Sequence, residues 1–253
     1  MTVYALTLEY LGTPFVGWQR QDNGLSVQQV LEEAAAMLND GVVPLSTAAG
    51  RTDAGVHAEG QVAMLELNRD IAPDKLRDAL NFHTKPHPVS VLRAALAPAG
   101  WNARFSAMHR GYRYRILNRR PRPALDEGQV WHLPQRLDAA AMHEAAQGLL
   151  GQHDFSAFRA AACQAKSALR TLDRLVVSRQ GAEVVVEAEA RSFLHHQVRN
   201  LVGTLADVGL GKRGVEWPRR VLESRDRTKA GMTAPAEGLC FTFVRYPEEP
   251  AWV

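Results

Sequence analysis

The sequence lacks the features that define several large protein classes. It has only two cysteines, Cys163 and Cys240, which are too few for a disulfide framework and lack zinc-site spacing. No apolar run approaches the about 18 residues that a membrane-spanning helix needs. There is no glycine-rich motif for phosphates or dinucleotides, and no basic and apolar leader precedes the first strand pattern. We therefore expect a cytoplasmic protein that uses no nucleotide or redox cofactor.

Acidic residues are missing from one stretch, although the net charge of the whole chain is only +3. This stretch, residues 101–122, is called the basic strip, and its arginines are Arg104, Arg110, Arg113, Arg115, Arg119, Arg120 and Arg122. Four aromatic residues, including Tyr112 and Tyr114, are interleaved with them. Arginines bind phosphates and aromatic rings stack on bases, so the composition fits an RNA-binding surface. A solvated basic strand that binds nothing is the alternative.

Hydrophobic periodicity predicts two successive sets of elements in the same order. The first set has strands at 3–10, near 42–49, at 61–67 and 89–96, and helices at 26–38 and 73–80. The second has strands at 110–118, 172–178, 183–190 and 239–246, and helices at 138–150, 195–208 and 217–224. The first order, β-α-β-β-α-β, is ferredoxin-like, and the second adds one helix. The predicted fold class is α+β, with two ferredoxin-like halves (1–103 and 104–253) side by side. They are expected to form a mostly antiparallel mixed sheet with a central cleft.

The candidate catalytic segment is Gly50-Arg51-Thr52-Asp53-Ala54-Gly55-Val56-His57. Its two glycines suit a tight loop between strands, and in extended chain Arg51 and Asp53 share a face. A guanidinium nearby favours the ionised carboxylate that a nucleophile or base requires. The alternative is a surface turn with an incidental ion pair.

Two further groups are candidates for the same chemistry. Tyr112 and Tyr114 lie on one face of their predicted strand, where one ring could stack on a base or both could be core. Arg199 lies at the edge of an apolar helical stripe, where an arginine reaches water or meets a carboxylate such as that of Asp53. The nine histidines suggest no metal site. His83 and His87 are separated by a proline, and His195-His196 would diverge on a helix.

Many of these segments together resemble the tRNA pseudouridine synthase A family. The octapeptide, followed by Gly60-Gln61-Val62, is similar to that family's active-site signature. The other matching segments are Tyr10-Leu11-Gly12, Phe15–Gln21, Asn102–Ala107, Tyr112-Arg113-Tyr114, His153-Asp154-Phe155, Phe158-Arg159, Phe193–His196, Val198-Arg199-Asn200 and Ala234–Leu239. Gln197 departs from the pattern, because the family usually has methionine there. The resemblance covers nearly the whole chain.

The resemblance implies roles for particular residues. Asp53 would be the catalytic aspartate, and Arg51 beside it would assist base flipping. Tyr112 would lie against the target uracil, Arg199 would be the partner of the aspartate, and Leu239 would form a wall of the pocket.

The resemblance also implies substrate and partners. The family isomerises uridines at positions 38, 39 and 40 of the tRNA anticodon stem-loop, as a homodimer without cofactor or metal. Among residues of the basic strip, Arg104 and Arg110 are expected to bind the substrate. Two other functions remain as alternatives. One is a non-catalytic RNA-binding module, and the other is a glycoside hydrolase, which would need a second carboxylate where the nearest candidate is Glu59.

Overall fold

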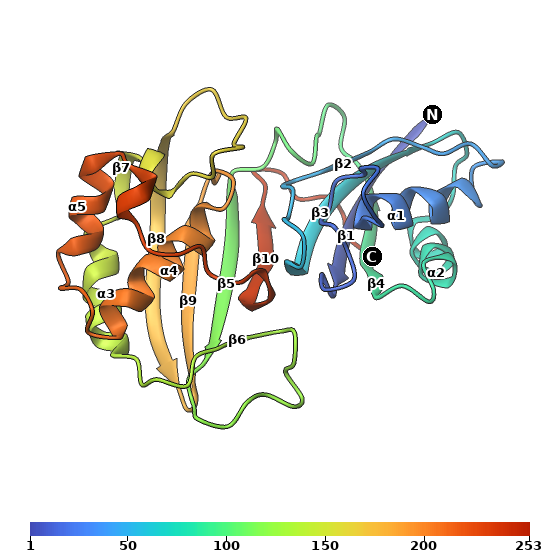
Figure 1. Ribbon diagram of the computed structural model, residues 1–253. Coiled ribbons are helices and arrows are strands. Elements are labelled where there is room, and N and C mark those ends of the chain that lie inside the picture. Colours follow the sequence, from blue (N-terminus) through green and yellow to red (C-terminus); the bar gives the residue numbers. More distant parts are fainter. The chain divides into compact units, whose positions relative to one another are not determined.

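The computed structural model describes residues 1–253, which form two compact units (Figure 1). Unit 1 comprises Met1–Met108 and Phe241–Val253, and unit 2 comprises His109–Cys240. The predicted division into 1–103 and 104–253 stays a prediction; the structure adds that the end of the chain packs with unit 1. No helix in either unit combines the length and the apolar character needed to cross a membrane.

Unit 1 has the ferredoxin-like order of elements. Its strands are β1 (Thr2–Tyr10), β2 (Ser46–Ala48), β3 (His57–Leu67) and β4 (Val89–Leu96), and its helices are α1 (Val27–Ala36) and α2 (Pro73–His83). The strands lie in the order β4-β1-β3-β2, with every pair antiparallel. The predicted β-α-β-β-α-β order is thus confirmed for this unit.

Local signals in the sequence explain where the helices of unit 1 begin. Ser26 caps α1, because its side chain accepts a hydrogen bond from the Gln29 backbone N–H at 3.2 Å. The Gln29 side chain does not complete a capping box with Ser26, since it donates to Glu33 instead. Pro73 occupies the first turn of α2, where its missing N–H has no helical partner to lose.

Both faces of the unit 1 sheet are covered. Tyr4, Leu6 and Leu8 of β1 are fully buried within the core of the unit. A second cluster contains Ala5 of the same strand together with Val62, Trp101, Ala103 and Tyr246. The Tyr246 hydroxyl donates to the Ala103 carbonyl at 2.7 Å. This cluster explains why the C-terminal segment belongs to unit 1.

The predicted strand near residues 42–49 is only partly correct. The ladder is limited to β2, and the preceding apolar residues Val42, Val43 and Leu45 are exposed. Asn39 closes a turn just before this segment, because its side chain donates to the Val42 carbonyl at 2.9 Å and its carbonyl accepts from the Val42 N–H at 3.0 Å. A short apolar run is therefore not sufficient for a strand when a local side-chain bond stabilises a turn.

Unit 2 is a second α+β unit. Its strands are β5 (His109–Leu117), β6 (Trp131–His132), β7 (Gly151–Asp154), β8 (Leu169–Gln180) and β9 (Glu183–Ala190). Its helices are α3 (Ala139–Gln147), α4 (Gln197–Gly209) and α5 (Trp217–Ser224), with 3-10 turns η1 (Ser156–Phe158), η2 (Arg227–Lys229) and η3 (Ala236–Gly238). Strand β10 (Leu239–Arg245) begins at the end of this unit and continues into unit 1.

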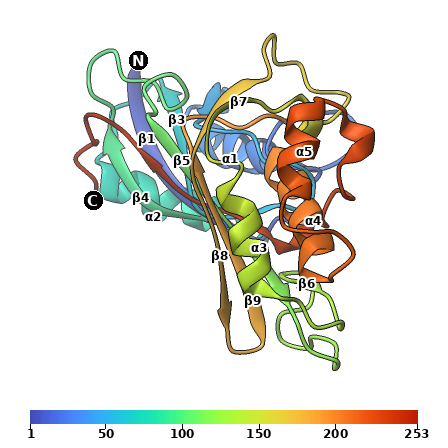
Figure 2. The ribbon, with the colours of Figure 1, turned by 90° about the vertical axis from the view of Figure 1, so that its left-hand side faces the viewer.

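The sheet of unit 2 is mostly antiparallel and has its helices on one face. The strands lie in the order β5-β9-β8-β7, and β6 adds a short parallel pairing to β5. Figure 2 shows α3, α4 and α5 on the same side of β8 and β9. The predicted stripe of α4, from Val198 to Val208, is buried, and each such aliphatic side chain contributes about 1.5–3 kcal/mol. The α+β class and the mostly antiparallel mixed pairing are confirmed.

Candidate active site

The Asp53 loop connects β2 to β3 within unit 1. Its turn is closed by a hydrogen bond from the Val56 N–H to the Asp53 carbonyl at 3.1 Å. Gly55 has φ +78°, a left-handed backbone conformation that residues with a side chain rarely adopt, so glycine is strongly favoured there. Asp53 is half-buried, whereas Arg51 is exposed. The loop therefore presents a carboxylate from a fixed backbone.

A second loop, residues 11–24, packs its backbone against the backbone of the Asp53 loop, and we call it the supporting loop. The Trp18 N–H donates to the Thr52 carbonyl at 3.0 Å, and the Gly55 N–H donates to the Phe15 carbonyl at 3.3 Å. Gly17 has φ +108°, and a Cβ there would lie 2.7 Å from the Thr52 carbonyl oxygen. Only glycine permits this approach, so the position of Asp53 depends on Gly17.

The start of the supporting loop makes an equally close contact. A Cβ on Gly12 would lie 2.1 Å from the Val56 carbonyl oxygen. The Gly12 N–H donates to Nδ1 of buried His57 at 2.9 Å, which leaves that ring nitrogen unprotonated. His57 is therefore a structural residue of the loop, an assignment that its place in the octapeptide does not reveal.

Side chains under the Asp53 loop hold the residues on either side of it. The Tyr10 and Thr52 hydroxyls are hydrogen-bonded at 2.8 Å and buried. Gln61, fully buried on β3, donates to the Gly50 carbonyl at 2.7 Å. The loop is thus fastened at Gly50, Thr52 and Gly55, which brackets Asp53.

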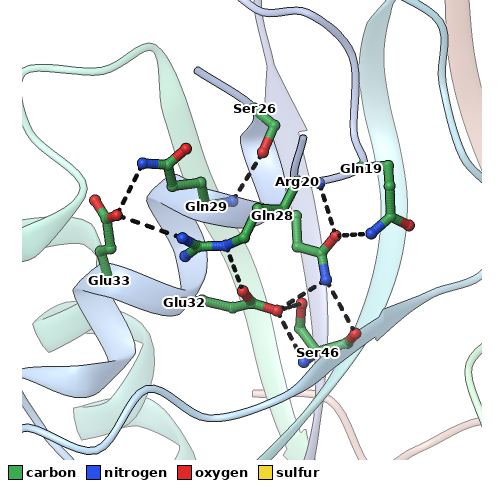
Figure 3. A network of polar contacts seen from close by, with 8 residues as sticks. All are labelled: Gln19, Arg20, Ser26, Gln28, Gln29, Glu32, Glu33 and Ser46. Carbon is green, nitrogen blue, oxygen red and sulfur yellow. Dashed lines mark hydrogen bonds and ion pairs between the residues drawn. The ribbon is translucent and has the colours of Figure 1, made fainter. Parts of the chain in front are cut away.

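The supporting loop is itself anchored by a buried carboxylate. Glu32 on α1 is 4% exposed and accepts hydrogen bonds from Arg20, Gln28 and Ser46 (Figure 3). The Ser46 contacts come from both its N–H, at 3.1 Å, and its hydroxyl, at 2.8 Å. Since Ser46 begins β2 and Arg20 follows Trp18, the network ties the supporting loop to the strand that leads into the Asp53 loop.

The two tyrosines of β5 have different environments. Tyr114 is fully buried, and its hydroxyl donates to the Pro235 carbonyl at 2.7 Å. Burial raises the Tyr114 pKa far above its usual value, while Arg199 opposes that shift and Glu237 adds to it. Tyr112 is half-buried, with its ring edge-to-face against Phe193 at a centroid distance of 5.2 Å. Of the two, Tyr112 is the ring that remains partly accessible for stacking.

Tyr114 also fixes the start of β10. A Cβ on Gly238 would lie 2.6 Å from the Tyr114 ring, so only glycine fits between the ring and the backbone. The next residue, Leu239, is 5% exposed. Leu239, the residue predicted to form a wall of the pocket, is therefore held in place through Gly238 and the Tyr114 ring.

Arg199 is positioned by the segment that follows η2. Its Nε–H donates to the Ala234 carbonyl at 2.8 Å, and the Ala234 N–H donates to the Arg199 carbonyl at 3.1 Å. A Cβ on Gly203, one turn further along α4, would lie 1.8 Å from the Met232 carbonyl oxygen. Residues 231–234 therefore run directly against the helix and set the orientation of the guanidinium.

Two arginines of the basic strip, Arg110 and Arg115, are bound to other residues of unit 2. Arg110 is 9% exposed, and its guanidinium donates to the Arg191 carbonyl. Arg115 pairs with Glu183 at 2.7 Å and with Asp126 at 3.1 Å, and these bonds raise its pKa. Arg104 lies in unit 1, with its guanidinium 5.7 Å from the exposed Phe105 ring. The missing acids of the strip are thus supplied in part from elsewhere in the chain.

His195 and His196 precede α4 and do not lie on it. Their rings are 4.1 Å apart, because the backbone at His196 is left-handed with φ +61°. The predicted start of this helix near residue 195 was therefore two residues early. A left-handed backbone is uncommon outside glycine, and Asp40 and Arg225 adopt it in this chain as well.

Comparison with known proteins identifies close relatives. A sequence profile described as tRNA pseudouridine synthase matches residues 7–106 and 145–247. The tRNA pseudouridine synthase A of Acidiphilium cryptum is 62% identical over 251 residues, which are 99% of this chain and 98% of the relative. That of Paramagnetospirillum magneticum is 59% identical over 246 residues, covering 97% and 96%. That of Rhodospirillum centenum is 58% identical over 246 residues, covering 97% and 100%.

These matches first define a class: the protein is an isomerase that modifies RNA. Within that class, the chain belongs to the tRNA pseudouridine synthase family. Its reaction is the conversion of uridine to pseudouridine in tRNA.

Proposed function

We propose that the protein modifies uridines 38, 39 and 40 of the tRNA anticodon stem-loop, with Asp53, Arg51 and Arg199 as its catalytic residues. The single observation that supports Asp53 most strongly is the construction of its loop. The backbone is fastened on both sides of the residue, at Thr52 and Gly55, while the side chain stays half-exposed. Such preorganisation suits a group that must meet one atom of a large substrate.

The reaction needs a nucleophile or base but no change of oxidation state. The N1–C1′ bond of uridine breaks, the uracil turns, and a C5–C1′ bond forms. The hydrogen of C5 leaves as a proton and N1 gains one, so atoms and charge balance. The carboxylate of Asp53 can attack the ribose or the base, or remove a ribose proton to give a glycal.

Substrate binding in this proposal is divided between stacking and charge. The target base must leave its stack, at a few kcal/mol, before any bond to it can change. We assign Tyr112 to the exposed face of the flipped uracil and Leu239 to a wall of its pocket. Arg104 is assigned to the RNA backbone. Arg110 is assigned to substrate binding as well. Its guanidinium donates to the Arg191 carbonyl, which holds the side chain in position.

The proposal includes a homodimer that holds one tRNA across both subunits, and a cytoplasmic place of action. Both assignments carry over the expectations drawn from the sequence. Size-exclusion chromatography with light scattering tests the first: a monomer that modifies tRNA at full rate would contradict it.

Tritium release combined with position mapping tests the proposed substrate. The wild-type protein should release tritium from tRNA labelled at uridine C5, because C5 loses its hydrogen in the reaction. Carbodiimide labelling and primer extension should then stop at positions 38, 39 or 40. Release with stops only elsewhere in the tRNA would refute the anticodon assignment. Binding without release would favour the passive RNA-binding module.

A further inference from the structure

The described surface of unit 2 contains a groove at the opposite end of its elements from Tyr112 and Arg199. The groove has a volume of about 780 Å³, and Arg136, Arg179 and Arg213 line it together with the start of α3 and the end of α4. On α4, Arg199 and Gly209 are separated by ~15 Å, at 1.5 Å per residue. On β5, Tyr112 and the residue after the strand, Asn118, are separated by ~20 Å, at 3.3 Å per residue. We call this groove the distal basic groove.

Asn118, near the end of the basic strip, bonds two of the residues that line the groove. Asn118 Oδ1 accepts hydrogen bonds from the Leu137 N–H at 3.0 Å and from Arg179 at 2.8 Å. Arg179 also donates to the Leu137 carbonyl at 2.7 Å, so this arginine is fixed in place. The exposed residues Arg119 and Arg120 follow Asn118 directly. Figure 1 shows the connection that carries β6 at the same end of unit 2 as the β8–β9 hairpin.

The charge of the groove is positive after its acids are counted. Asp138 caps α3, since its carboxylate accepts from the Ala141 N–H at 3.0 Å. Asp207 pairs with Lys212 at 3.2 Å, so its charge is compensated by a cation outside the three arginines. Arg213 is exposed and held over the Trp217 ring, with its guanidinium carbon 5.1 Å from the centroid. Three guanidinium groups therefore face one flanking carboxylate that is already used as a cap.

We propose that the distal basic groove binds the phosphate backbone of the tRNA outside its anticodon stem-loop. Guanidinium groups are well suited to phosphate, and the substrate of the family is a long polyanion. The phosphates that flank the target uridine are too close to the reacting bond to reach a groove ~15 Å away. The groove thus contributes affinity for whole tRNA and not to the chemical step. This inference depends on the proposed function for the place of the target uridine.

The test compares two RNAs and a set of arginine variants. The RNAs are a transcribed tRNA that the wild-type protein modifies and its isolated anticodon stem-loop. The proteins are wild type, Arg136→Gln/Arg213→Gln, Arg213→Lys and the control Arg174→Gln. Arg174 is an arginine of the same unit whose charge is already paired with Glu187 at 2.8 Å and Glu189 at 3.5 Å. Dissociation constants are measured by filter binding over a series of salt concentrations, and thermal unfolding checks that each variant folds.

The double variant should bind tRNA roughly 10- to 100-fold more weakly at moderate salt, with a salt slope lower by about two. Its affinity for the isolated stem-loop and its kcat at saturating tRNA should equal those of wild type. Arg213→Lys and Arg174→Gln should stay near wild type. Unchanged tRNA affinity in the double variant, or an equal loss on the stem-loop, would overturn the proposal. If the double variant lost binding to polyglutamate but kept its affinity for tRNA, the groove would bind an acidic protein segment, and the proposal would be overturned as well.

The proposed function fails through a different measurement. If an Asp53→Asn protein still released tritium, the proposed catalytic role of Asp53 would be refuted, whatever the tRNA affinities of the groove variants. Groove variants with normal tRNA affinity would remove the groove and leave the role of Asp53 intact.

Discussion

Replacing Gly17 by alanine tests whether the supporting loop sets the position of Asp53. The new Cβ would lie 2.7 Å from the Thr52 carbonyl oxygen and 3.1 Å from the carbonyl carbon of Asp53. Backbone cannot yield as a flexible side chain does, so one of the two loops must move. The substitution therefore displaces the residue that we assign to the chemistry without touching its carboxylate.

The expected effects follow from the size of that clash. Restoring an ordinary contact of 3.4 Å needs a shift of about 0.7 Å, and a 1 Å misplacement lowers catalytic rates by up to about 100-fold. We therefore expect kcat to fall roughly tenfold or more, with a smaller change in KM. The left-handed backbone adds about 1–2 kcal/mol and the overpacking about 1–3 kcal/mol, so the free energy of unfolding falls by roughly 2–5 kcal/mol.

Gly41→Ala is the matched control for this experiment. Gly41 is also left-handed, with φ +80°, but a Cβ there meets nothing within 4 Å. It should lose about 1–2 kcal/mol of stability and no kcat. The assay is single-turnover tritium release at a temperature where circular dichroism shows all three proteins folded. Wild-type kcat in Gly17→Ala, or an equal loss in Gly41→Ala, would refute the reasoning.

Three other outcomes follow from buried groups. Burial raises the pKa of Tyr114 in the folded protein. The free energy of unfolding is therefore unaffected by this group below the unfolded-state pKa near 10, and above it falls by up to about 1.4 kcal/mol per pH unit, because only the unfolded protein releases the proton. Tyr114→Phe should remove this pH dependence, measured by urea unfolding at pH 9 to 11. Glu32→Ala removes a buried acceptor from the half-buried Gln28 and Ser46 and the exposed Arg20, and should lower the free energy of unfolding by about 1–3 kcal/mol, whereas exposed Glu33→Ala should change it by less than about 1 kcal/mol. Gly203→Ala should destabilise the protein and lower kcat, although alanine normally favours a helix by about 1 kcal/mol, because its Cβ would displace Met232; an increase in melting temperature would contradict this.

Local signals were sufficient to predict most of the fold. Alternating strands such as β1, β4 and β9, and the apolar stripe of α4, carry their periodicity in the sequence itself. The edge strands β6 and β7 were missed, because they are short and their ladders depend on pairing with β5 and β8. The exposed irregular segment at Val42 and Val43 was predicted as strand, because β-branched residues favour strands whether or not a partner strand is present.

For the candidate site, the sequence predicted the residue types better than their surroundings. Asp53 and its glycines stand out as a motif, and Tyr112 as a strand aromatic. The fastening of the loop by Gly12 and Gly17 is a contact between backbones, which no side-chain pattern reveals. The charge of the basic strip was overestimated, because Arg115 finds its carboxylates in Glu183 and Asp126, which lie outside it.

Asp53→Asn is the most direct test of the central claim, that the carboxylate on the fastened loop performs the isomerisation. Asparagine keeps the size of the side chain and one hydrogen-bonding oxygen but removes the charge and the basicity. With tRNA labelled at uridine C5, we predict no tritium release above background, together with unchanged tRNA affinity. Release at the wild-type rate would contradict the account.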